Sequence, residues 1–259
     1  MPMPPWNETG RYREELLLAL RFLTRLPLGR AIFAEPGSLA RAGWAFPLVG
    51  ALIGIGAWIA YAVATALSLP PVAAALIAVG AGVLLSGALH EDGLADTADG
   101  LGGGGDVMEK LAIMRDSRSG AFGVLALIFS VGLRAAALAF IGRRPEVLGA
   151  LVAAHAVGRG ALPVALAALP SARSEGLGAS AGRPTTPVAA LAAAIAVVLA
   201  LIVLGLGAGI EAVIAAAIVM ALIAGLAFRQ IGGHTGDILG AIEQGGETMM
   251  LLAAAAWGP

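Results

Sequence analysis

The chain has 259 residues, of which 59% are hydrophobic and only 13% are charged, with 16 basic residues against 17 acidic ones. An average soluble domain carries about 25% charged residues, so the composition predicts an all-α, polytopic integral membrane protein. The net charge of −1 excludes the basic surface of a nucleic-acid-binding protein, and the absence of cysteine excludes disulfides, Cys-ligated iron–sulfur clusters and thiolate zinc sites.

The first segment of the chain, residues 1–42, is expected to lie at the membrane surface. Charged residues interrupt every apolar stretch there: Glu14, Glu15, Arg21 and Arg25. This pattern excludes a signal peptide. We expect residues 12–34 to form an interfacial helix whose arginines reach the lipid headgroups.

Apolar runs of about 20 residues or more, long enough to cross a bilayer, follow in the rest of the chain. The Pro70-Pro71 pair divides the first run into a helical hairpin. The predicted spans are 43–68, 72–89, 120–142, 147–170, 184–210 and 212–228. A further run, 238–257, contains two glutamates, so the sequence predicts six to seven transmembrane helices in one membrane-embedded domain over residues 1–259.

The basic residues predict the orientation of these spans. Most of them lie in the N-terminal segment and in the polar loops 90–119, 171–183 and 229–237, whereas only Arg143 and Arg144 fall in a loop on the other side. Because positively charged loops stay in the cytoplasm, we expect the N-terminus and all three polar loops to be cytoplasmic. The spans are rich in Ala and Gly, which permit close helix packing and are compatible with a homo-oligomer.

An acidic cluster begins the loop 90–119. Asp92, Asp96 and Asp99 are spaced at i, i+4 and i+7, so on a helix all three side chains lie on one face. Carboxylate oxygens suit a hard cation, so the spacing predicts a Mg²⁺ site, with Mn²⁺ as the alternative ion. A solvated acidic loop is the plainer interpretation. His90, directly beside the cluster, is a candidate general base or orienting residue.

Candidate phosphate-binding residues precede the predicted span at 120–142. They stand just before its N-terminus, where backbone N–H groups favour an anion. They are Arg115, Asp116, Ser117 and Arg118. Alternatively, these arginines only anchor the loop at the headgroups. Arg173 and Thr235 add a guanidinium and a hydroxyl in the other two loops of the same side.

Four charged residues lie inside apolar stretches, where an uncompensated charge costs roughly 2.5–3.5 kcal/mol on insertion scales. They are Arg134, Arg159, Glu243 and Glu247. We expect the two arginines to pair with carboxylates or to face the site, and the two glutamates to be functional. His155 and His234 are expected to be hydrogen-bonded structural residues. The charges together indicate Mg²⁺-assisted chemistry on a phosphate ester or pyrophosphate.

With these motifs, the chain resembles the cobalamin synthase family over nearly its full length. The segments that carry the resemblance are residues 22–27, 46–50, 92–100, 114–123, 170–178 and 235–237, with Gly240, Ala241 and Glu247 after them. The segments 92–100 and 235–237 are the most specific. Glu91 and Arg115 depart from the family pattern, in which an apolar residue is usual at the first position and Lys is also common at the second, but neither change removes a ligand.

The resemblance implies transfer of the cobinamide-phosphate moiety of adenosylcobinamide-GDP to α-ribazole or its 5′-phosphate, with release of GMP. It implies Mg²⁺ on Asp92, Asp96 and Asp99, a second ion on Asp237 and Glu247, and a carboxylate or His90 that takes the hydroxyl proton. The phosphate-binding residues that it implies are Arg115, Asp116, Ser117, Arg118, Arg173 and Thr235. It also implies a multi-pass protein of the bacterial cytoplasmic (inner) membrane whose active site faces the cytoplasm.

Three other classes of membrane protein fit less well. A CDP-alcohol phosphotransferase shares the opening D-x2-D-G of its signature with residues 96–100, but Gly103 and Gly104 occupy the Ala-Arg positions and the later acidic block is missing. A membrane prenyltransferase would need more aromatic residues than the 5% present. A secondary transporter would commonly show an internal repeat, and this sequence shows none.

Overall fold

The computed structural model describes residues 6–29, 37–116, 118–142 and 144–257, and in these ranges the chain contains helices and loops with one isolated bridge. The all-α prediction is therefore confirmed. The helices are α1 (Trp6–Leu23), α2 (Ser38–Ala42), the 3-10 helix η1 (Gly43–Ala45), α3 (Phe46–Ala66), α4 (Pro71–Ser86), α5 (Leu89–Gly103), α6 (Val107–Ile113), α7 (Ala121–Ile141), α8 (Arg144–Ala168), α9 (Leu177–Ser180), α10 (Thr186–Leu204), α11 (Leu206–Ile231) and α12 (Gly236–Trp257).

Five segments of the described chain are long and apolar enough to cross a membrane: α2 to α3, α7, α8, α10 and α11. Helices α4 and α5 make a sixth only if they count as one span, and they are bent by 94° relative to each other. The multi-pass prediction is therefore confirmed with five to six spans. Helix α12, the seventh candidate, is not among them.

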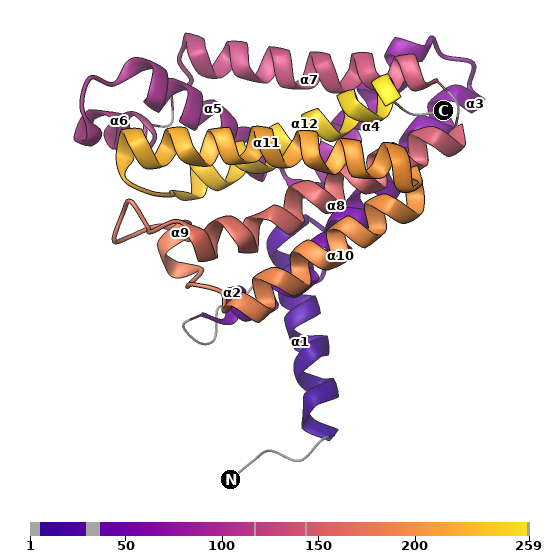
Figure 1. Ribbon diagram of the computed structural model, residues 1–259. Helices are drawn as coiled ribbons and strands as arrows, with labels where there is room; N and C mark the ends of the chain where they lie inside the picture. Colours follow the sequence, from indigo (N-terminus) through magenta and orange to yellow (C-terminus); the bar gives the residue numbers. More distant parts are fainter. Residues whose placement is uncertain (1–5, 30–36, 117, 143, 258–259) are drawn as a thin grey trace.

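Helix α8 runs through the middle of the bundle and packs against α3, α10 and α12 (Figure 1). In its apolar stretch 83% of the residues are buried, against 22% in α10 and 17% in α11. Helix α11 instead exposes large apolar side chains at every fourth position: Ile210, Ile214, Ile218 and Leu222. Such an outward apolar stripe is what a helix needs in order to face lipid.

The crossing of α3 and α8 depends on two glycines one helical turn apart. A Cβ atom on Gly54 would lie 2.6 Å from the carbonyl oxygen of Leu151, and one on Gly50 would collide with the carbonyl oxygen of His155. Small residues at this spacing let two backbones approach closely in a membrane, where no hydrophobic force drives helices together. This contact fixes the position of the buried His155.

The structure corrects two sequence-based boundaries. Residues 72–89 do not form one span, because Gly87 and Ala88 adopt left-handed conformations with φ of 70° and 58° and end α4. Residues 90–119 are not a loop, since α5 and α6 occupy most of them.

The N-terminal helix is also shorter than the predicted 12–34. Helix α1 ends at Leu23, and Thr24 caps this end by donating its hydroxyl to the carbonyl oxygen of Leu20. Part of the predicted helix, residues 30–34, lies outside the described residues.

Candidate active site

Two loops meet at the end of the bundle that carries α5, α6 and α9 (Figure 1). The backbone of the loop after α8 pairs with the loop before α12: the N–H of Ala172 donates to the carbonyl oxygen of His234 (2.8 Å), and the N–H of His234 donates to that of Pro170 (2.9 Å). Gly233 permits this approach, because a Cβ atom there would collide with the Pro170 carbonyl oxygen. The pairing places Arg173 beside Asp237.

Arg173 links both loops to the acidic residues. Its Nη1 donates to Asp237 Oδ2 at 3.3 Å, and its Nη2 donates to the Leu111 carbonyl oxygen at 2.7 Å. Thr235 donates its hydroxyl to the same Asp237 oxygen (3.1 Å) and accepts a bond from the N–H of Ile238. The Nε of Arg173 is buried and has no hydrogen-bond partner among the described residues.

These groups line a pocket to which Asp92 and His90 of α5 also contribute. Burial raises the pKa of Asp237, although Arg173 and the Thr235 hydroxyl act against the rise. Burial likewise lowers the pKa of Arg173, against the charge of Asp237. The pocket is therefore partly shielded from water, and charges placed in it interact strongly.

The three aspartates of α5 differ in their burial and in their partners. Asp92 is exposed, Asp96 is half-buried and Asp99 is buried. Asp99 accepts hydrogen bonds from the backbone N–H of Gly120 (2.7 Å) and of Gly123 (2.9 Å), so it uses both oxygens to cap the N-terminus of α7. The three aspartates lie on one helix as predicted, and Asp99 in addition binds the N-terminus of α7. Binding of Mg²⁺ by all three stays a prediction.

Asp92, Asp96 and Asp237 are the carboxylates that fit a hard cation. Burial raises the pKa of Asp96 to about 6, the negative charges of Asp92, Asp237 and Asp99 add to this rise, and the charge of Arg173 opposes it. Their oxygens do not form a closed cage among the described residues. An open arrangement suits Mg²⁺, which keeps several waters and is held by one or two carboxylates together with substrate phosphates.

Of the predicted phosphate-binding residues before α7, the three that the structure describes do not line the pocket. Asp116 and Arg118 pair with each other at 2.6 Å on the surface, and the hydrogen bonds from Arg118 lower the pKa of Asp116 to about 2. Arg115 lies near enough to Arg173 for its charge to act on that residue. Ser117 lies outside the described residues. Binding of phosphate by this loop stays a prediction.

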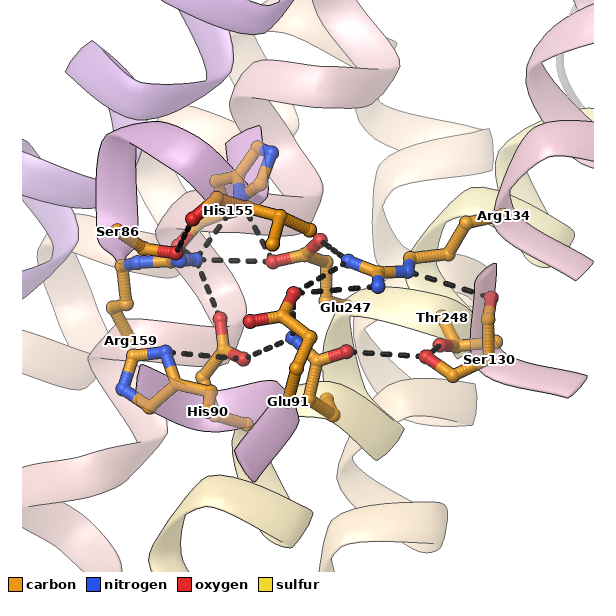
Figure 2. Close-up of polar contacts among 12 residues, drawn as sticks. Ser86, His90, Glu91, Ser130, Arg134, His155, Arg159, Glu247 and Thr248 are labelled. Atoms are coloured by element: carbon orange, nitrogen blue, oxygen red, sulfur yellow. Dashed lines mark hydrogen bonds and ion pairs between the residues drawn. The ribbon is translucent and has the colours of Figure 1, made fainter. Parts of the chain in front are cut away.

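A buried ion network lies deeper in the bundle, between α5, α7, α8 and α12 (Figure 2). Arg134 donates to Glu247 Oε1 at 2.6 Å and lies 3.3 Å from Glu91 Oε1. Arg159 donates to Glu243 and to Glu247 Oε2, the latter at 3.0 Å. All five side chains are nearly or fully shielded from solvent. The expectation that the intramembrane arginines pair with carboxylates is confirmed.

The two histidines of the network have different surroundings. His155 Nδ1 lies 2.7 Å from Glu247 Oε2, so His155 is a hydrogen-bonded residue of the interior as expected. His90 Nδ1 faces Glu243 Oε2 at 3.4 Å, while His90 also lines the pocket. His90 therefore connects the network to the pocket. His234 lies in the paired loops, where burial lowers its pKa.

The structure does not bring Glu247 to Asp237. Both residues lie on α12, ten positions apart, which separates them by about 15 Å along the helix. Glu247 is instead held by Arg134, Arg159 and His155. A second ion shared by Asp237 and Glu247 therefore does not fit this structure.

The sequence alone did not indicate the role of Glu91, a residue that departs from the family pattern. It is 7% exposed and accepts from Arg134 and from the amide of Gln244. The available signal was the pair of intramembrane arginines, since each needs a buried carboxylate.

The fold and the site define a multi-pass membrane protein with a carboxylate- and arginine-lined pocket at one end of its helical bundle. The chain belongs to the cobalamin-5-phosphate synthase family, whose model matches residues 15–255. It is 47% identical to an adenosylcobinamide-GDP ribazoletransferase of Bradyrhizobium diazoefficiens over 98% of both chains. It is 43% identical to the enzyme of that name from Mesorhizobium japonicum, over 93% of this chain and 92% of that one. No solved structure matches the chain.

Proposed function

We propose that the chain catalyses the reaction for which these relatives are named. The cobinamide-phosphate moiety of adenosylcobinamide-GDP is transferred to α-ribazole or its 5′-phosphate, and GMP leaves. One observation carries the proposal: three family segments far apart in sequence, 92–100, 170–178 and 235–237, all contribute residues to one pocket. A substrate bound there meets carboxylates, a guanidinium and a histidine together.

The reaction replaces one phosphorus–oxygen bond by another. A ribose hydroxyl of α-ribazole attacks the phosphorus nearer the cobinamide, the bond from this phosphorus to the GMP oxygen breaks, and the hydroxyl loses its proton. Such a displacement needs mostly positioning and charge stabilisation from the protein. The pocket contains charged side chains that can position the substrates and stabilise the developing charge.

We assign the phosphate oxygens to Arg173. Its guanidinium is held in place by Asp237 and by the Leu111 carbonyl oxygen, and Arg173 lines the pocket, so its positive charge can act on a non-bridging oxygen of the pyrophosphate. A charge-assisted bond of this kind is stronger than one between neutral groups. Arg115 adds positive charge at the rim.

We assign the hydroxyl proton to His90. Glu243 faces Nδ1 of this ring, and the other ring nitrogen is turned away from the network (Figure 2). A histidine oriented by a carboxylate at one nitrogen can accept a proton at the other. Asp92, Asp96 and Asp237 are then free to hold Mg²⁺, or Mn²⁺ in its place, which neutralises charge on the pyrophosphate when bound.

We further propose that the protein lies in the bacterial cytoplasmic membrane, with its N-terminus and pocket on the cytoplasmic side. The three polar loops rich in basic residues gather at the end of the bundle that carries the pocket (Figure 1). Positively charged loops are retained in the cytoplasm. Nucleotide substrates are also made on that side.

The test uses the purified protein in lipid vesicles with adenosylcobinamide-GDP, α-ribazole and Mg²⁺. We expect GMP to appear in step with the cobamide product, and no GMP without α-ribazole. The Asp92→Asn variant is the matched control: since Asp92 is exposed, we expect the variant to fold, and since Asp92 is assigned to the ion site, we expect it to release no GMP. A folded wild-type protein that releases no GMP, or releases it without α-ribazole, would contradict the proposal.

A further inference from the structure

The pocket is lined by two kinds of side chain. Its polar residues include Asp92, Arg173 and Asp237, which have just been assigned to phosphate and metal, and also His90, Ser171, Glu175 and Thr235. The remaining lining is mostly apolar and comes from α1, α2, α3, α8 and α12: Phe22, Leu39, Phe46, Leu162, Leu166 and Leu239. Of these, all but Phe22 are at most 8% exposed. The five buried side chains belong to a hydrophobic core cluster, against which Phe22 packs. Since this cluster also forms a wall of the pocket, it offers an apolar surface to a part of a substrate other than its phosphates.

The apolar part is held in a defined shape. The rings of Phe22 and Phe46 stack with centroids 6.2 Å apart. The segment after α1 is tied to the end of α4, because the N–H of Arg25 donates to the carbonyl oxygen of Leu85 at 2.7 Å. Pre-formed apolar pockets with a few polar groups are typical of small-molecule sites.

The size of the pocket limits what enters it. Its volume is about 180 Å³, whereas pockets that enclose a whole drug-sized ligand hold about 300–1,000 Å³. A corrinoid macrocycle is therefore too large to be enclosed in it, whereas a single flat ring system fits. On the proposed function, two ring systems compete for the place: the guanine of the donor and the benzimidazole of α-ribazole.

The chemistry of the lining separates these two. Guanine carries donors and acceptors along its edges, and against leucine and phenylalanine side chains they would lose their hydrogen bonds to water without replacement. The dimethylbenzimidazole base has two methyl groups and no N–H when attached to ribose. We propose that the apolar part of the pocket binds the base of α-ribazole, with Leu166 among the residues that set base preference. This inference rests on the proposed function.

The first test fills the apolar part of the pocket. Leu166→Phe adds bulk to a packed site, so the KM for α-ribazole should rise about tenfold or more, while the KM for adenosylcobinamide-GDP stays unchanged. Val164→Phe on the same helix is the matched control, since Val164 is 41% exposed and does not line this pocket. With the wild-type protein, removing one methyl from the base should raise the KM about fourfold.

The second test needs no variant. In equilibrium dialysis of α-ribazole with wild-type protein in detergent, free 5,6-dimethylbenzimidazole should displace the nucleoside and guanosine should not. Displacement by guanosine alone, or a Leu166→Phe variant whose KM rises only for adenosylcobinamide-GDP, would overturn the assignment. Neither result would contradict the proposed function, because the wild-type protein would still release GMP. A wild-type protein that forms no GMP would instead refute the proposed function.

Discussion

The cap that Asp99 forms on α7 allows a direct test of how the acidic cluster is divided. Replacing Asp99 by Asn keeps the size of the side chain but removes its charge and one of its two acceptor oxygens. In the structure these oxygens accept from Gly120 and Gly123 at 2.7 and 2.9 Å. The amide NH₂ of asparagine would face one of these N–H groups instead.

The expected loss follows from these contacts. A hydrogen bond to a charged group contributes about 1.5–3 kcal/mol, and a negative charge at a helix N-terminus adds about 0.3–1 kcal/mol. The variant loses one hydrogen bond, the negative charge that strengthens the second bond and the interaction with the helix dipole. Together these losses should lower the free energy of unfolding by about 3 kcal/mol. For a chain of this size, that corresponds to a fall of roughly 6–12 °C in Tm.

One assay measures Tm from the intrinsic fluorescence of the four tryptophans while the detergent-solubilised protein is heated. A second assay measures enzymatic activity as a function of Mg²⁺ concentration. Asp92→Asn is the matched control, since it removes an exposed carboxylate of the same helix. It should keep the wild-type Tm and lose turnover. Asp99→Asn should melt earlier, and its residual activity should need no more Mg²⁺ than wild type. An Asp99→Asn variant with wild-type Tm and a higher Mg²⁺ requirement would refute the cap and restore Asp99 as a ligand.

Three further outcomes are expected. His90→Gln should lower kcat about 10²–10⁴-fold, as loss of a general base does, with both KM values unchanged in steady-state assays; an unchanged kcat would assign the proton elsewhere. Asp237→Asn should raise the Mg²⁺ concentration for half-maximal rate, measured by titration, because it removes a carboxylate of the proposed ion site. Arg134→Met should lower stability by about 3–5 kcal/mol, since it leaves buried carboxylates unpaired; melting should show this loss, and Leu133→Met on the lipid side of α7 should not.

Much of the fold could be predicted because membrane spans depend on hydropathy alone. The runs at 120–142 and 147–170 agree closely with α7 and α8. The break between α4 and α5 could not be predicted in the same way. Ala88 adopts a left-handed φ of 58°, which its residue type disfavours, so tertiary contacts impose this conformation.

The site was predictable as a set of residues but not as a geometry. Asp92, Arg173 and Asp237 were each singled out by type and loop position, and they do meet. Asp99 has the same residue type and the same helical spacing as Asp92, yet a helix end more than twenty positions later in the chain takes both of its oxygens. Spacing along one helix does not show what the opposite element offers.

The buried ion network explains how the pocket keeps its shape. Removing charges from water is costly, and lipid tails are as apolar as leucine, so apolar packing alone discriminates poorly between helix registers in a membrane. A shift of α12 by one turn would exchange one apolar contact for another, but Glu243 and Glu247 are themselves one turn apart, so the shift would leave only one of them beside Arg159 and take the other away from its partners. We infer that the network fixes the register of α5, α8 and α12. Since these helices also carry pocket residues, the network determines how far Asp92 lies from Asp237, and therefore whether the two can share an ion.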